Sequence, residues 1–115
     1  MIMSNESPPP EIDCRSVRSK LERREPMLLL DCREPEAYAL VKIDGAQLWP
    51  MSELSERIGE LTPYRDTEVV VYCHHGVRSL HVAMWLRRQG FSRVTSMAGG
   101  IDRWAAEIDP TLPRY

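Results

Sequence analysis

Blocks of apolar residues alternate along the chain with amphipathic blocks, and this pattern predicts strands and helices in turn. The blocks at 27–31 and 68–73 are apolar on both faces and bounded by turn-forming residues, as is typical of buried strands. Shorter apolar blocks at 46–49 and 94–97 predict two further strands. Helices that alternate with buried strands indicate an α/β fold with a mostly parallel sheet.

The amphipathic blocks predict five helices. These helices begin at or just after Asp13, Pro35, Ser52, Arg78 and Gly100. The second is expected to continue through Val41. The third, with Ser52 as its cap, is expected to stop at Pro63 because proline ends a helix. The fourth is expected to end before Gly90, where glycine suits a left-handed cap.

Composition narrows the class of protein. The chain has 115 residues, of which 43% are apolar and 28% are charged, as expected of one globular domain. A net charge of −2 argues against nucleic acid held by bulk positive charge. The longest apolar run, 69–73, falls far short of the roughly 20 residues of a membrane span, so no membrane partner is expected.

The first residues contain Pro8-Pro9-Pro10 but neither a basic start nor an apolar segment, so we expect no secretory signal in them. Residues 1–10 are expected to form a flexible tail without tertiary contacts, and residues 11–115 to form the single domain. Since no targeting signal is visible, the expected compartment is the reducing cytoplasm.

Three cysteines, an odd number without close spacing, argue against a disulfide framework and against a zinc site. Cys14 lies on the inner face of the first expected helix, and Cys32 follows a strand, so both are assigned to packing rather than to a resolving role. Cys73 ends the central strand, and reactive groups of parallel sheets gather at the carboxyl ends of strands. Cys73 is therefore the candidate for chemistry.

The loop from Cys73 to Arg78 joins a strand to the start of a helix. Backbone N–H groups at such a start have no helical partner, and together with the helix dipole they stabilise an anion or a thiolate. Gly76 permits a turn that a side chain would hinder. Arg78 adds a fixed charge, and His74 and His75 add donors for an entering anion.

Four motifs in order now resemble those of the rhodanese domain family, the sulfurtransferases, over about residues 11–109. They are Leu29-Leu30-Asp31-Cys32-Arg33-Glu34-Pro35, Lys42-Ile43-Asp44-Gly45-Ala46, the C-x4-R loop from Cys73 through Arg78, and Met97-Ala98-Gly99-Gly100-Ile101 with Trp104. The second motif departs from the family at three places, where Val41, Lys42 and Asp44 replace the usual glycine, histidine and proline.

The resemblance implies a rhodanese-like α/β fold with a central, mostly parallel five-stranded sheet and helices on both faces. It also implies a double displacement, in which Cys73 takes sulfane sulfur from thiosulfate or a protein persulfide and passes it to cyanide or a thiol. Residues His74, His75, Gly76, Val77 and Arg78 would form the persulfide-binding loop, with Arg78 shaping the loop and binding the donor. Asp31 and Arg33 would give structural support.

No metal or organic cofactor is implied, and a sulfur-carrier protein is a candidate partner. Two other readings stay open at this point. A non-catalytic rhodanese-like module would bind a partner, although the retained Cys73 argues against it. A cysteine phosphatase or arsenate reductase would use a similar cradle, but phosphatase loops are of the wider C-x5-R type, whereas four residues separate Cys73 and Arg78.

Overall fold

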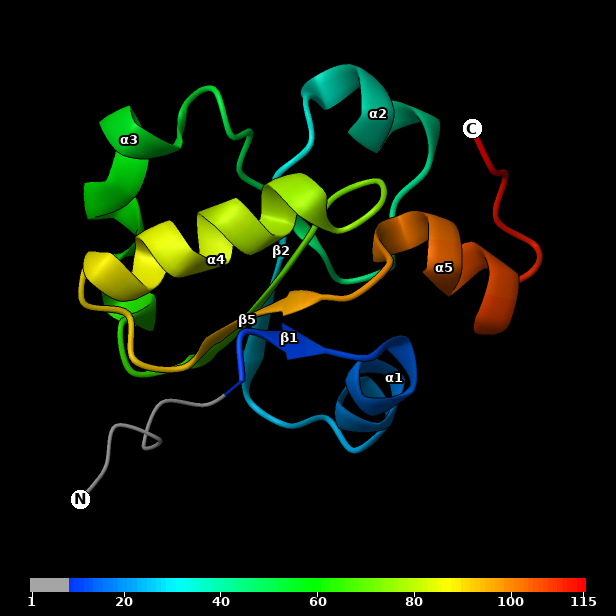
Figure 1. Cartoon of the computed structure of the whole chain (residues 1–115), viewed down its shortest axis with the longest axis horizontal. Coiled ribbons are helices and arrows are strands. Elements are labelled where there is room, and N and C mark those ends of the chain that lie inside the picture. Colours follow the sequence, from blue (N-terminus) through cyan, green and yellow to red (C-terminus); the bar gives the residue numbers. More distant parts are fainter. Residues whose placement is uncertain (1–8) are drawn as a thin grey trace.

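A computed structural model describes residues 9–115, and Figure 1 shows strands running through its middle with helices on either side. The strands are β1 (Glu11–Ile12), β2 (Met27–Asp31), β3 (Gln47–Leu48), β4 (Glu68–Tyr72) and β5 (Val94–Met97). The helices are α1 (Cys14–Glu22), α2 (Pro35–Leu40), α3 (Leu54–Arg57), the 3-10 helix η2 (Ile58–Tyr64), α4 (Val77–Arg88) and α5 (Gly100–Glu107).

The five strands form one sheet in the order β1-β5-β4-β2-β3, and every neighbouring pair is parallel. This confirms the predicted fold class. The strand that the sequence pattern did not assign is β1, which pairs with Ser96 and Met97 of β5. Two residues are too few to show the alternation of a strand, so β1 carries no readable pattern.

Side chains alternate across the sheet and so build two cores. Leu28 and Leu30 of β2 face the core that α3 and α4 cover, whereas Leu29 faces the core under α1 and α5. On β4, Val69 and Val71 join the first core and Val70 the second. Both faces of the sheet are therefore covered and shielded from water, which is why β2 and β4 are apolar on both sides.

Two predicted helices end differently from expectation. Helix α2 stops at Leu40, and Val41 is extended and buried, because its carbonyl accepts a hydrogen bond from the buried Arg33. Ser52 does not cap the third helix, since its hydroxyl donates to Glu34 at 2.7 Å. Pro63 does not stop that helix either, but lies inside η2.

The flexible tail expected at residues 1–10 overlaps the described residues only at Pro9 and Pro10. Residues 1–8 lie outside the described part of the chain, but Pro9 and Pro10 already contact the domain. The Pro10 carbonyl accepts from the Ser96 N–H at 2.8 Å, and the Pro9 carbonyl accepts from Arg87 at 2.9 Å. Among residues 9–115, the helices are too short and polar to cross a membrane.

Candidate active site

Cys73 follows β4 directly, and the short loop after it leads into α4. Gly76 adopts a left-handed conformation (φ +98°) immediately before α4 begins at Val77. A side chain rarely adopts this φ, and a Cβ at Gly76 would also lie 3.0 Å from the backbone nitrogen of Gly99. The glycine therefore allows the turn that brings the first N–H groups of α4 back toward Cys73.

The Cys73 sulfur is buried and accepts hydrogen bonds from the backbone N–H groups of Gly76 at 3.2 Å and Ser79 at 3.3 Å. The Ser79 hydroxyl lies 3.3 Å from the same sulfur and is held by the Ser96 hydroxyl at 2.7 Å. The neighbouring Cys32 thiol is the largest cause of a Cys73 pKa lowered from 9.0 to about 4. The Ser79 and Gly76 donors add to this effect, although burial opposes it. The lowered pKa favours the thiolate, which is the nucleophilic form of cysteine.

The N-terminal end of α5 holds the loop from the other side. The Ile101 N–H donates to the Cys73 carbonyl at 2.9 Å, and the Asp102 N–H donates to the His74 carbonyl at 3.0 Å. A Cβ at Gly100, whose φ is +62°, would collide with both of these carbonyl oxygens. Glycine at this position thus lets two helix starts, those of α4 and α5, meet at one loop.

A buried ion pair, Asp31–Arg33, connects several segments around the loop. Asp31 and Arg33 are fully buried, and Arg33 donates to Asp31 from Nε at 2.9 Å and from Nη2 at 2.6 Å. Arg33 also donates to the Val41 carbonyl and, at 2.6 Å, to the Tyr115 hydroxyl. The Tyr115 ring stacks on His74 with 4.0 Å between ring centroids. The pair therefore ties the end of β2 to the residue after α2, to the C-terminal segment and to the loop.

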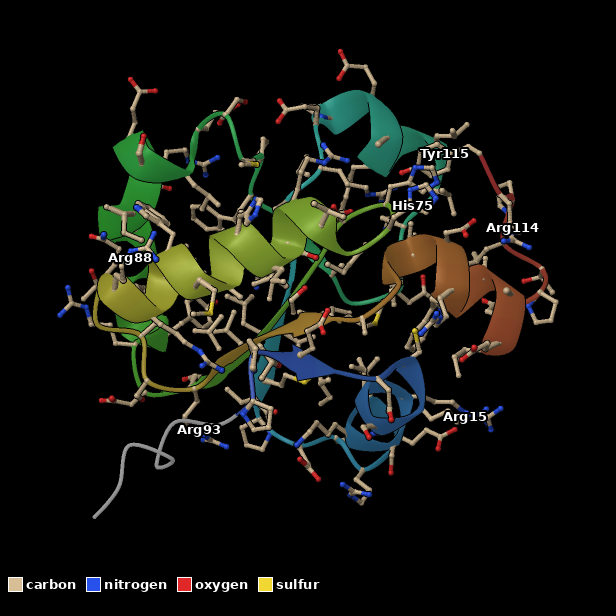
Figure 2. The ribbon with its side chains drawn as sticks, in the orientation of Figure 1. Arg15, His75, Arg88, Arg93, Arg114 and Tyr115 are labelled. Carbon is tan, nitrogen blue, oxygen red and sulfur yellow. The ribbon has the colours of Figure 1, made fainter. Side chains whose placement is uncertain are left out.

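The rings of His74 and His75 also stack, with centroids 3.9 Å apart, and Figure 2 shows His75 and Tyr115 close together near the start of α5. Burial, and then the neighbouring His75, lower the pKa of His74, so this ring is neutral at neutral pH. Ligand atoms of His74, His75 and Asp102 lie within 4.8 Å of one another, as in a metal site. However, Arg114 already engages both oxygens of Asp102 at 3.1 Å, and stacked rings do not direct their nitrogens toward one point. We therefore assign no metal to this cluster.

Val77 and Arg78 form the outer side of the loop. Val77 is 65% exposed, and Arg78 is exposed as well. Among the side chains of residues 9–115, that of Arg78 takes part in no hydrogen bond or ion pair, so it does not shape the loop by bonding to it. The bonds that hold the loop come instead from backbone groups of α4 and α5, and the exposed Arg78 adds a positive charge at the start of α4.

Comparison with known proteins agrees with this geometry. A family model described as the rhodanese-like domain matches residues 13–107. The chain belongs to the rhodanese-like domain family. A sulfurtransferase of Allochromatium vinosum is 38% identical over 95 residues, which are 83% of this chain and 87% of the relative. The structure of a human single-domain sulfurtransferase superposes with a TM-score of 0.76 at 25% identity, covering 87% of this chain and 98% of that one.

Other relatives contain the rhodanese-like domain as one part of a longer protein. The chain is 35% identical to a probable adenylyltransferase/sulfurtransferase of Mycobacterium tuberculosis over 88% of its own length but only 26% of the relative. It spans 40% of a chloroplastic rhodanese-like/PpiC domain-containing protein of Arabidopsis thaliana. The family is thus common to separate domains and to domains joined to other activities.

Three residues near the site of this rhodanese-like domain were not assigned to it from the sequence. Ser79 lies on the buried face of α4, and a hydroxyl among apolar positions of a helix is the signal that marks it. Cys32 was assigned to packing, although it occupies the position after β2 just as Cys73 follows β4. Tyr115 carries no sequence signal for the site, because its stacking on His74 depends on tertiary structure.

The buried pair generates a prediction about stability. Asp31→Asn keeps the shape of the side chain but leaves the Arg33 charge buried without its partner, which costs about 3 kcal/mol of unfolding free energy. Denaturant unfolding followed by circular dichroism measures this loss. The control is Glu53→Gln, which removes an exposed pair with Arg57 and is expected to cost less than about 1 kcal/mol. Equal losses in the two variants would contradict the prediction.

A second prediction concerns the charge on Cys73. Thiolates absorb near the ultraviolet edge, so the difference in absorbance between the parent domain and Cys73→Ser reports the thiolate across pH. We expect this difference to remain as pH falls through neutrality and to vanish only near the lowered pKa of about 4. Ser79→Ala, which removes one donor, is expected to raise that pKa. Loss of the signal near 9.0, the ordinary value, would show that the cradle does not act on the sulfur.

Proposed function

We propose that this rhodanese-like domain is a sulfurtransferase that carries sulfane sulfur on Cys73 as a persulfide. The donor is thiosulfate or a protein persulfide, and the acceptor is cyanide or a thiol, including the thiol of a sulfur-carrier protein. The observation that carries the proposal is the buried Cys73 sulfur, on which the N–H groups of Gly76 and Ser79 converge at the start of α4. Relatives named as sulfurtransferases support it.

In the first step the Cys73 thiolate attacks the outer sulfur of thiosulfate. A bond forms between the two sulfurs, the bond inside thiosulfate breaks, and sulfite leaves with the electron pair. The negative charge then resides on the terminal persulfide sulfur, beside a helix start whose unpaired N–H groups favour an anion. Arg78 at the entrance supplies a positive charge toward the anionic donor.

In the second step an acceptor thiolate or cyanide attacks the terminal sulfur. The bond between the terminal sulfur and Cys73 breaks, and the thiolate of Cys73 returns. A thiolate of low pKa leaves readily in such exchanges, so the donors that activate Cys73 in the first step also make it a good leaving group in the second. No step calls on a metal or an organic cofactor.

The surroundings of the loop favour large acceptors as well as small ones. The exposed side chains of Val77 and Arg78 lie on the loop that follows the buried Cys73, so a partner protein can dock beside the site. One relative, 31% identical over 56% of its length, is a putative sulfur carrier protein of Bacillus subtilis. Because transfer needs a free thiol at Cys73, we also propose a reducing compartment, the cytoplasm, for this protein.

The proposed transfer predicts that Cys73→Ser reduces the initial rate of thiocyanate formation from thiosulfate and cyanide to background, because the hydroxyl is not ionised at neutral pH. Cys14→Ser is the matched control, since Cys14 lies in the other core and burial raises its pKa to about 11. This control is expected to keep its rate within about twofold. Full activity of Cys73→Ser, or turnover of para-nitrophenyl phosphate without sulfur transfer, would refute the proposal.

Arg78 generates a separate prediction. Arg78→Ala removes a charge from the entrance and is expected to raise the KM for thiosulfate about tenfold, as the loss of one charge-assisted contact does. The same substitution at Arg88, at the opposite end of α4 from His75 (Figure 2), is expected to leave KM unchanged. An equal KM in both variants would show that Arg78 does not meet the donor.

A further inference from the structure

Cys32 and Cys73 occupy equivalent positions at the ends of two paired strands. Strands β2 and β4 are parallel, and their last paired residues are Asp31 and Tyr72, so Cys32 and Cys73 come next in the same register. The Cys32 N–H donates to the Tyr72 carbonyl at 3.1 Å, which continues the ladder past the strand ends. Neighbouring strands lie roughly 4.8 Å apart, which falls inside the range that a disulfide spans.

Both sulfurs also lie on the same side of the sheet. Cys32 and Cys73 belong to the core that α4 covers, with exposed fractions of 0% and 1%. The Cys32 thiol is also the largest cause of the lowered Cys73 pKa, which agrees with the adjacent places of the two residues. The remaining donors to Cys73, Gly76 and Ser79, come from the loop and from α4 rather than from the strands.

We propose that Cys32 is a resolving thiol, which attacks the sulfur of a persulfidated Cys73 and releases the terminal sulfur as hydrosulfide. This inference rests on the proposed function, because it begins with the persulfide. A bond forms between the Cys32 and Cys73 sulfurs, and the bond from Cys73 to the terminal sulfur breaks. The proton of Cys32 leaves with the hydrosulfide, and the two electrons that reduce the sulfane sulfur come from forming the disulfide.

The adjacent, buried positions of Cys32 and Cys73 favour this step over attack by a group in solution. A nucleophile already beside its target reacts as if at a very high concentration, with no need to enter the site. The hydrogen bond to Cys73 and burial raise the pKa of Cys32, so Cys32 holds its proton in the resting domain. That bond weakens once the charge moves to the terminal sulfur, and the proton then has the departing sulfide as its acceptor.

The resulting activity is release of sulfide from thiosulfate or a persulfide donor, with a dithiol as the reductant that restores both cysteines. Cys14 takes no part in it, because Cys14 lies in the other core, where its thiol faces the Ala98 carbonyl at 3.7 Å. The chain thus contains its own control, a second buried cysteine on the far side of the sheet.

The test is a single turnover without cyanide or added thiol. The reduced domain is mixed with thiosulfate, sulfide is measured as methylene blue, and the intact protein is weighed by mass spectrometry. The parent domain and Cys14→Ser are expected to release one equivalent of sulfide and to lose two hydrogens, with peptide mapping placing the disulfide at Cys32–Cys73. Cys32→Ser, and Cys32→Val as a second packing variant, are expected to release none and to gain one sulfur atom.

Each outcome separates the two proposals. If the parent domain keeps the added sulfur and releases no sulfide, Cys32 does not resolve the persulfide, whereas the proposed transfer stands. If neither the parent nor the Cys32 variants gain sulfur or release sulfide, the proposed function itself fails, and this inference with it.

A progress curve gives an independent measurement with cyanide present and no reductant. The parent domain is expected to lose activity during turnover as the disulfide accumulates, and a dithiol is expected to restore it. Cys32→Ser is expected to keep a constant rate. Equal loss in both proteins would count against the inference.

Discussion

The burial of the Cys73 sulfur, whose surroundings lower its pKa and so favour the thiolate, is the constraint around which this domain is arranged. An isolated thiolate in a dry core is costly, so each donor on the sulfur compensates part of that cost. The donors come from three places, namely the backbone at the start of α4, the Ser79 hydroxyl and the thiol of Cys32. The parallel order of the sheet makes this possible, because it brings the ends of β2 and β4 to the same edge.

A second buried charge lies one register position earlier and on the other face of the sheet. Asp31 pairs with Tyr72 in the ladder, and Tyr72 belongs to the core under α1 and α5. The Asp31–Arg33 pair therefore lies on the opposite face of the sheet from Cys32 and Cys73. Through the hydroxyl of Tyr115 and its stacking on His74, the ion pair reaches the loop that holds the thiolate. The loop from Cys73 to Arg78 is thus connected both to the Cys73 sulfur and to the Asp31–Arg33 pair.

The fold was predictable because its strands are apolar on both faces, which only a covered parallel sheet explains. The place of the Cys73 loop was predictable because β4, Cys73 and the start of a helix follow one another in the chain. Contacts that depend on tertiary structure could not be predicted from the sequence. The sequence departs from the family motif at Val41, yet Arg33 uses only the Val41 carbonyl, which any residue supplies. Lys42 is exposed and lies over the Tyr38 ring, so its replacement leaves the buried tie intact.

In the proposed transfer, the Cys32 thiol that favours the Cys73 thiolate also limits how long Cys73 can hold a persulfide. Before sulfur is loaded, the proton of Cys32 stabilises the thiolate. After loading, the Cys73 sulfur becomes an electrophile beside a thiol that is already in place. An external acceptor must then reach the terminal sulfur faster than Cys32 reaches the inner one. The exposed residues Val77 and Arg78 on the loop favour the first route, and the adjacent, buried Cys32 favours the second. The supply of acceptor therefore decides between sulfur transfer and sulfide release.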